Sequence, residues 1–203
     1  MHSLQSWRRR PGSLLVHASM LSNRWNQPSP MSDRVFNVLF LCTGNSARSI
    51  MAEAALQHRG KGRFQAFSAG SHPSDQPHPM TIELLKEMSH DVSELRSKSW
   101  HEFSGPDAPP LDFVFTVCDS ARAETCPVWL GQPVTAHWGV DDPAAFEGSE
   151  AARRRFFRRI YTELESRIEI FVSLPVEFLD AMTLRQEMER SDETSSAPDR
   201  KLE

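Results

Sequence analysis

The chain has 203 residues and a formal net charge of −4, and 39% of its residues are hydrophobic. This length is typical of one globular domain with flanking segments. The negative charge argues against a general nucleic-acid binder, and no run approaches the ~18 uninterrupted apolar residues of a membrane-spanning helix. Three cysteines without a CxxC pair suggest neither a disulfide framework nor a zinc site. We therefore expect a soluble, cytoplasmic protein whose cysteines are catalytic or redox-active.

The two ends of the chain differ in composition from its body. Residues 1–32 contain no Asp or Glu and several arginines and prolines. Such a composition resembles a transit peptide, but it is also that of a disordered extension upstream of Met31, which we favour. The last fifteen residues are polar and lack aromatic side chains, so they should fray. We expect an N-terminal extension over residues 1–33, a folded domain over 34–188 and a flexible tail over 189–203.

The most informative segment lies between an apolar run at residues 36–41, typical of a strand, and residues 50–56, typical of a helix. Its residues are Cys42, Thr43, Gly44, Asn45, Ser46, Ala47, Arg48 and Ser49. In a strand–loop–helix arrangement the loop amides can surround a tetrahedral anion, and the helix N-terminus adds its positive dipole end. The planar guanidinium of Arg48 matches two anion oxygens at once. The loop therefore predicts a site for a phosphate-like oxyanion.

Cys42 begins this loop and is the candidate nucleophile. The positive field should favour its thiolate, and we expect its pKa to fall from about 8.5 to about 6, worth roughly 3.4 kcal/mol. A lone cysteine six residues before an arginine is common in proteins. Here the preceding strand, the turn-permitting Gly44, the hydroxyls of Ser46 and Ser49 and the following helix all favour an anion-binding nucleophile.

Strands and helices alternate along the rest of the chain. The expected elements are a helix at about 47–58, a strand at 64–68, a helix at 80–88, strands at 111–117 and 133–138, a long helix capped by Ser149 and stopped by Pro175, and a helix at about 176–188. This alternation predicts an α/β fold, a three-layer sandwich with a four-stranded parallel sheet flanked by helices. Ligands bind beyond the carboxyl ends of such strands. The Cys42 loop and Cys118 both follow strands and should face the same crevice.

The other two cysteines, Cys118 and Cys126, are separated by seven residues in a polar segment. An enzyme that only hydrolyses phosphate esters does not need such a pair, whereas a reductase can pass oxidation along it by disulfide exchange. The alternative is two buried packing cysteines. Against that alternative, Cys126 lies in a polar stretch before Pro127.

A carboxyl group after the fourth strand could donate a proton over the same crevice. The candidates are Asp141 and Asp142, followed by the stiffening Pro143. Asp141 could instead only cap the next helix, so Asp142 is the better candidate acid.

The arginines at 153–155, 158 and 159 could suggest nucleic-acid binding. Such a run is far more often the solvated face of an amphipathic helix, and the nearby Glu150, Glu163 and Glu165 balance its charge. We expect no nucleic-acid partner.

These pieces together resemble a known family. The CTGNSARS loop at 42–49, the Ser-Ala-Gly at 68–70 and the late Asp-Pro at 142–143 resemble the low-molecular-weight protein tyrosine phosphatases. The added cysteine pair and the HWGVDDP sequence at 137–143 are more similar to the arsenate reductases built on that fold. The resemblance covers roughly residues 35–185.

The resemblance implies a role for each candidate residue. Cys42 would be the nucleophile, Arg48 and the loop amides would hold the oxyanion, and Asp142 would be the general acid. Cys118 and Cys126 would be the resolving pair. The activity implied is reduction of arsenate, with a thioredoxin- or glutaredoxin-type electron donor and no required cofactor. Some reductases of this kind bind potassium beside the loop, and here Asn45, Glu53 and Ser68 could contribute oxygens, with no convincing further ligand.

The chain also departs from the phosphatases, which usually place aromatic residues after the Asp-Pro to grip a phosphotyrosine ring. Here Ala144, Ala145 and Phe146 follow, and Tyr161 is the only tyrosine of the chain. This favours a small inorganic substrate. The alternatives are a phosphatase acting on phosphotyrosine or small phosphate esters, and a non-catalytic anion-sensing partner. The presence of nucleophile, arginine and acid together argues against the second.

Overall fold

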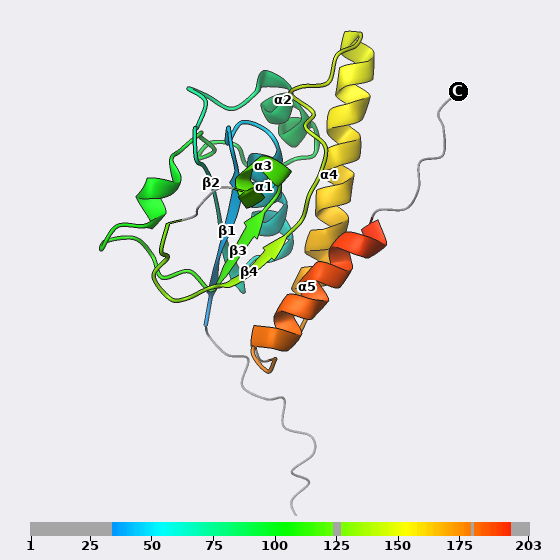
Figure 1. Cartoon of the computed structure of the whole chain (residues 1–203). Coiled ribbons are helices and arrows are strands. Elements are labelled where there is room, and N and C mark those ends of the chain that lie inside the picture. The colour runs from blue at the N-terminus through cyan, green and yellow to red at the C-terminus, as the bar shows by residue number, and fades with distance from the viewer. Residues whose placement is uncertain (1–33, 124–126, 180, 196–203) are drawn as a thin grey trace, which may run out of the picture. The chain divides into compact units, whose positions relative to one another are not determined.

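Figure 1 shows the computed structural model of the chain, which describes residues 34–123, 127–179 and 181–195. The expected N-terminal extension, residues 1–33, lies outside this described part. The elements of the described part are β1 (Phe36–Cys42), α1 (Arg48–Arg59), β2 (Phe64–Gly70), α2 (Pro79–Glu87), the 3-10 helix η1 (Trp100–Phe103), β3 (Phe113–Thr116), α3 (Asp119–Ala123), β4 (Val134–His137), α4 (Glu150–Ser173) and α5 (Ala181–Ser195). Among the helices of the described part, none combines the length and the apolar character needed to cross a membrane.

The four strands form one parallel sheet in the order β2-β1-β3-β4, which confirms the predicted fold class. The chain moves from β1 to β2 on one side and then crosses to β3 on the other, so the strand order reverses at β1. Near the carboxyl ends, Leu41 of β1 is paired in register with Thr116 of β3. Ligands of such sheets bind where the order reverses, and the Cys42 loop follows β1 at this point.

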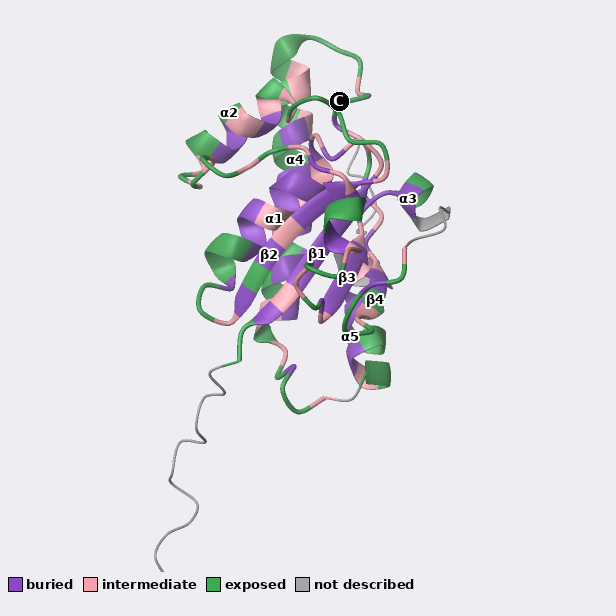
Figure 2. Cartoon of the chain, turned by 90° about the vertical axis from the view of Figure 1, so that its left-hand side faces the viewer, coloured by how far each residue is buried: buried purple, intermediate pink, exposed green. Residues whose placement is uncertain are grey.

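Two hydrophobic clusters cover the two faces of the sheet. Because successive residues of a strand point to opposite faces, Val38 and Phe40 join the larger cluster, which includes side chains of α1, α4 and α5. Leu39 and Leu41 join a smaller cluster with the η1 residue Trp100 and side chains of neighbouring loops. Figure 2 shows buried residues concentrated along the strands and in α1. The α-helices therefore pack on one face, and η1 with its adjoining loops packs on the other.

The longest helix, α4, begins where the sequence predicted. The Ser149 hydroxyl accepts a hydrogen bond from the Ala152 amide, and the helix ends before Pro175. Its buried apolar positions recur at steps of three and four: Phe157, Ile160, Leu164, Ile168 and Phe171. Its arginines form surface ion pairs: Arg154 with Glu83, Glu87 and Glu150, and Arg158 with Glu87. The arginine run thus contributes to a solvated, charge-balanced helix face.

The last helix corrects two expected boundaries. We expected a helix at about 176–188 and a frayed tail from 189, but α5 spans Ala181–Ser195. The second half of α5 packs against the domain. Ser191 is only 4% exposed, and the buried Arg167 of α4 forms an ion pair with Asp192 at 3.0 Å. The sequence around these positions is polar, so its composition concealed a helix that tertiary contacts stabilise.

Candidate active site

The loop after β1 turns its carbonyl groups outward and its amides inward. The carbonyl oxygens of Thr43, Gly44 and Ser46 accept hydrogen bonds from backbone amides of residues 72–78, at 2.8 to 3.0 Å. Since C=O and N–H point in opposite directions across a trans peptide, the amides of the following residues face the interior of the loop. One of them, the Asn45 N–H, donates to Cys42 Sγ at 3.1 Å. A concave array of backbone donors of this kind is the arrangement that binds anions in other proteins.

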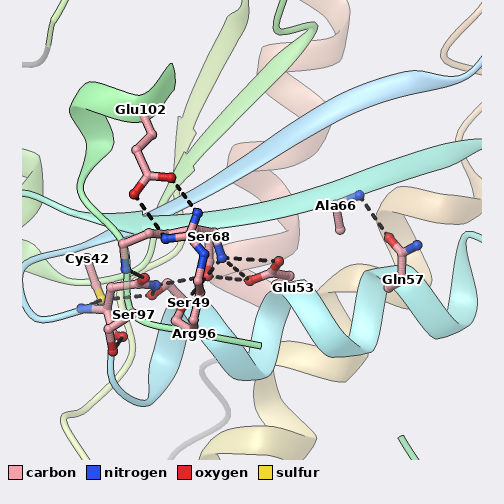
Figure 3. Close-up of polar contacts among 11 residues, drawn as sticks. Cys42, Ser49, Glu53, Gln57, Ala66, Ser68, Arg96, Ser97 and Glu102 are labelled. Carbon is pink, nitrogen blue, oxygen red and sulfur yellow. Dashed lines mark hydrogen bonds and ion pairs between the residues drawn. The ribbon is translucent and has the colours of Figure 1, made fainter. Parts of the chain in front are cut away.

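Asn45 is the residue at which the loop turns. Its φ is +42°, in the left-handed region that Asn tolerates better than most residues. Its side chain is fully buried and donates to Ser49 Oγ at 2.9 Å and to Ser68 Oγ at 2.8 Å. Figure 3 shows this network, in which Cys42 contacts Ser49, and Ser68 contacts Glu53. The Asn45 side chain joins the two serines. The loop shape is therefore held by side-chain contacts as well as by its backbone.

The expected fall in the pKa of Cys42 is wrong for this geometry. Cys42 is only 3% exposed, and burial raises the pKa of its thiol. The Ser49 hydroxyl, 2.9 Å from Cys42 Sγ, opposes this rise, as do Arg48 and the Asn45 amide, while the nearby Cys118 adds to it. The sequence revealed the positive field but not the loss of water around the sulfur, which is the larger effect.

Arg48, which follows the loop, and Asp142, which follows β4, are in contact. The Arg48 Nη2 lies 2.7 Å from Asp142 Oδ2, and its Nη1 donates to the Val140 carbonyl at 3.2 Å. The other carboxylate oxygen of Asp142 accepts from the Ala144 amide at 3.0 Å. The Asp142 side chain is 40% exposed. It can therefore approach both an oxyanion in the loop and solvent, whereas Asp141 is exposed at the surface.

Cys118 lies beside the oxyanion loop. Its Sγ is 3.7 Å from Thr43 Oγ1, and its side chain is 2% exposed. The amide of Ala121 in α3 donates to the same sulfur at 3.4 Å. The adjacent carboxyl ends of β1 and β3 thus bring the two cysteines Cys42 and Cys118 to the same crevice. Cys126 lies outside the described residues, so the proposed partner of Cys118 stays a prediction.

Two residues near the site were not singled out individually from the sequence. His137 at the end of β4 bridges Thr116 Oγ1, at 2.7 Å, and Asp119 Oδ1, at 3.0 Å. This contact links the start of α3 to the neighbouring strand. Lys98, in the loop before η1, is 7% exposed and pairs with Glu53 at 3.2 Å. No local pattern marks Lys98, because its partner lies 45 residues earlier.

With this geometry established, comparison with known proteins gives a consistent assignment. The family described as low molecular weight phosphotyrosine protein phosphatase matches residues 37–187. The chain belongs to this family. A protein of Bacillus licheniformis named arsenate reductase is 38% identical over 136 residues, covering 66% of this chain and 93% of that protein. Another arsenate reductase, from Shouchella clausii, is 36% identical over 134 residues, with coverage of 66% and 93%.

Solved structures show the same relationship within the family. An arsenate reductase from Archaeoglobus fulgidus is 27% identical with a TM-score of 0.54, covering 68% of this chain and 99% of that one. A structure described as an arsenate reductase in the phosphate binding state is 26% identical with a TM-score of 0.56, covering 68% and 98%.

The Ser-Ala-Gly sequence at residues 68–70 has a clear structural reason in this chain. A Cβ on Gly70 would lie 2.4 Å from the Thr43 carbonyl oxygen. Only glycine lets the end of β2 approach the oxyanion loop this closely. Ser68, two residues earlier, meets the Asn45 amide group. The motif therefore supports the shape of the loop from the neighbouring strand.

Proposed function

We propose that this protein reduces arsenate to arsenite through a covalent adduct on Cys42 and a disulfide relay through Cys118 and Cys126. The observation that carries the proposal is a second thiol, Cys118, 3.7 Å from the hydroxyl of the loop residue Thr43. Hydrolysis of a phosphate ester needs no second thiol at this place. The relatives named arsenate reductase support the same activity.

The first step is displacement of an arsenate oxygen by sulfur. Arsenate has the charge and tetrahedral shape of phosphate, so the inward-facing amides and Arg48 can bind it. An arriving arsenate dianion can take the proton of the Cys42 thiol, which generates the thiolate within the loop. The sulfur then bonds to arsenic, and the departing hydroxide takes a proton from Asp142 and leaves as water. Arsenic is still As(V) in this adduct.

Binding must first separate Arg48 from Asp142. In the anion-free geometry the guanidinium is held by the carboxylate at 2.7 Å. An oxyanion in the loop competes for the same guanidinium nitrogens. Once released, the solvent-exposed carboxylate of Asp142 can take up a proton from water and donate it to the leaving oxygen.

The second step transfers two electrons to arsenic. The Cys118 thiolate attacks Cys42 Sγ, the sulfur–arsenic bond breaks, and its electron pair goes to arsenic, which leaves as As(III) in arsenite. The two sulfurs lose these electrons as they form the Cys42–Cys118 disulfide. Attack of Cys126 on Cys118 then restores the Cys42 thiolate and moves the disulfide to Cys118 and Cys126. A thioredoxin- or glutaredoxin-type dithiol can reduce it by exchange.

Phosphatase activity is the second candidate, and the family assignment is the observation that favours it. The aromatic residue after the Asp-Pro does not support an aryl substrate. Phe146 is stacked on Phe156 of α4, with ring centroids 4.4 Å apart and an interplanar angle of 16°. One face of this ring is thus already covered. We therefore expect aryl phosphate hydrolysis only as a weak side activity of the same loop.

One pair of assays tests the proposal. Arsenate is added to the protein with thioredoxin, thioredoxin reductase and NADPH, and NADPH oxidation is followed; hydrolysis of an aryl phosphate is measured in parallel. We expect sustained, arsenate-dependent NADPH oxidation. A glutaredoxin, glutathione and glutathione reductase mixture identifies the other donor class. Absence of arsenate turnover with both donors, together with efficient aryl phosphate hydrolysis, would overturn the proposal in favour of the phosphatase.

A further inference from the structure

A buried ion pair lies beneath the oxyanion loop and has no part in the chemical steps above. The Lys98 ammonium is 3.2 and 3.4 Å from the two carboxylate oxygens of Glu53, and 3.4 Å from the carbonyl oxygen of Arg96. The two side chains are 7% and 12% exposed. Burying two charges costs desolvation free energy that their attraction often only balances. Stability alone is therefore a weak reason for this pair, and its connection to the loop suggests another.

Hydrogen bonds connect the ion pair to Asn45 in a determined direction. The Lys98 backbone N–H donates to Oδ1 of Asn45 at 2.8 Å, which turns the amide nitrogen of Asn45 toward the serines. That nitrogen donates to Ser68 Oγ at 2.8 Å. The Ser68 hydroxyl in turn donates to the Glu53 carboxylate. An ionised Glu53 therefore fixes the orientation of Ser68 and, through it, of Asn45.

The same amide orients the hydroxyl next to the nucleophile. Asn45 Nδ2 donates to Ser49 Oγ at 2.9 Å, so it occupies one lone pair of that oxygen. A hydroxyl has one proton to donate, and Ser49 Oγ lies 2.9 Å from Cys42 Sγ. The Asn45 contact leaves the proton of Ser49 available to the sulfur, where it stabilises the thiolate form of Cys42. The contact with Ser49 is the largest of those that lower the pKa of Cys42 against burial.

The residues that could have held potassium do not fit it here. Oδ1 of Asn45 already accepts the Lys98 N–H, and the Ser68 hydroxyl points its proton at Glu53. The Glu53 carboxylate already faces an ammonium. A potassium ion would bring a second positive charge to a carboxylate that is already neutralised.

We infer that the Lys98 ammonium is a built-in monovalent cation that takes the place of potassium beneath the loop, and that Lys98 is a positioning residue for Cys42. Burial raises the pKa of Glu53, and the charge of the Lys98 ammonium is the largest effect that opposes this rise, so it favours the ionised carboxylate. Ionised Glu53 orients Ser68, Asn45 and Ser49 in turn. A protonated Glu53 could donate to Ser68 and reverse this chain of donors. The inference requires Cys42 to be the nucleophile, as in the proposed function, but it does not require arsenate to be the substrate.

The buried carboxylate is also within reach of ions from solvent. Glu53 lines an open cavity of about 510 Å³, together with Gln57, His58, Lys61 and His90. When the Lys98 side chain is removed, a potassium ion can enter by this route and occupy the vacated position beside Glu53. This gives the inference a specific test.

The first measurement uses the full-length wild-type protein in potassium chloride and in choline chloride at equal ionic strength. Turnover, with arsenate or with an aryl phosphate, should be the same in both salts. Activation of the wild type by potassium would overturn the inference.

The second measurement compares Lys98→Ala with Lys61→Ala, a control that removes an exposed lysine from the cavity that Glu53 lines. Alkylation of Cys42 by iodoacetamide is followed against pH by mass spectrometry of the Cys42 peptide. In choline chloride, Lys98→Ala should raise the apparent pKa of Cys42 by about one unit, so that about tenfold less thiolate is present. Potassium chloride should reverse most of this shift, and Lys61→Ala should behave as the wild type in both salts.

A Lys98→Ala protein that alkylates like the wild type, or whose shift potassium leaves unchanged, would overturn the positioning role. If this variant does not fold, the comparison of the wild type in the two salts and the Glu53→Gln variant test the inference instead. Glu53→Gln keeps the size of the side chain but removes the charge that orients Ser68, so the pKa of Cys42 should again rise. Because alkylation requires no arsenate, these results are independent of the assays that test the proposed reduction.

Discussion

The two thiols of the site lie in very different surroundings, although both follow parallel strands. Cys42 enters a loop whose carbonyls are bonded to a neighbouring segment and whose Asn45 side chain is anchored to two serines. Cys118 precedes α3, a helix of five residues, and is held by one amide contact and the Thr43 hydroxyl. The contact between His137 and Asp119, which links β4 to the start of α3, involves an Asp119 side chain that is 95% exposed.

This difference corresponds to two chemical tasks. Oxyanion binding needs donors held in a fixed geometry before the substrate arrives. A thiol relay needs a sulfur that can leave its resting contacts and reach two other sulfurs in turn. A firmly anchored loop and a lightly held second thiol suit these tasks. The comparison would fail if the two thiols proved interchangeable, and the following experiments are designed to show whether they are.

The largest effect is expected at the anchored thiol. Cys42→Ser should eliminate arsenate turnover and aryl phosphate hydrolysis alike, because a serine hydroxyl is not ionised in this loop. Arg48→Lys should be nearly as damaging, since an ammonium cannot make the bidentate contact of a guanidinium. Both activities are measured on each variant. More than a few per cent of wild-type activity in Cys42→Ser would place the nucleophile elsewhere.

At the second thiol the two activities should separate. Cys118→Ser and Cys126→Ser should both abolish multiple turnover with arsenate and leave aryl phosphate hydrolysis nearly unchanged, because water alone clears Cys42 in hydrolysis. In a single turnover, Cys126→Ser should release about one arsenite per enzyme and stop as a Cys42–Cys118 disulfide, whereas Cys118→Ser should release almost none.

Mass spectrometry after one addition of arsenate identifies the trapped species in each variant. Wild-type arsenate cycling in both cysteine variants would rule out the relay and favour the phosphatase.

A smaller effect is expected at the acid. Asp142→Asn should slow the chemical step by about 10²- to 10⁴-fold, the usual contribution of a positioned general acid, while oxyanion binding persists. Asp141→Asn is the matched control, because its exposed carboxylate stands next in sequence without the contact to Arg48 that Asp142 makes. Single-turnover rates and phosphate inhibition separate chemistry from binding. A larger loss in Asp141→Asn would reverse the assignment.

The smallest expected effect is a shift in a pH profile. In the anion-free protein, burial raises the pKa of Cys42, so its alkylation rate should increase with pH and reach half-maximum above the ordinary range of a thiol. A group with a raised pKa in the folded state stabilises that state below its unfolded pKa, and this contribution is lost as the pH rises through the folded pKa. The melting temperature of the wild type should therefore fall over the same alkaline range by more than that of Cys42→Ala does. An alkylation rate that reaches half its maximum near pH 6 would instead support the lowered pKa of Cys42 expected from the sequence.

Much of the fold and of the site could be predicted because the signals are local. Strands and helices follow from the period of apolar residues, Ser149 and Pro175 mark the ends of α4, and residues 42–49 carry their own chemistry. The prediction was least successful in α5, whose polar second half is held by a contact between Asp192 and Arg167.

The sequence by itself determined the parallel α/β fold and predicted the oxyanion loop and its candidate nucleophile, since each depends on residues close together in the chain. Only the tertiary structure decided which distant residues act on that loop. Arg48 and Asp142 are 94 residues apart, and Lys98 and Glu53 are 45 apart, yet each pair is in contact because of the strand order. The same is true of the pKa of Cys42, which depends on how much water the folded chain removes from the sulfur. Burial is a property of the whole packed domain, and no local segment of the sequence contains it.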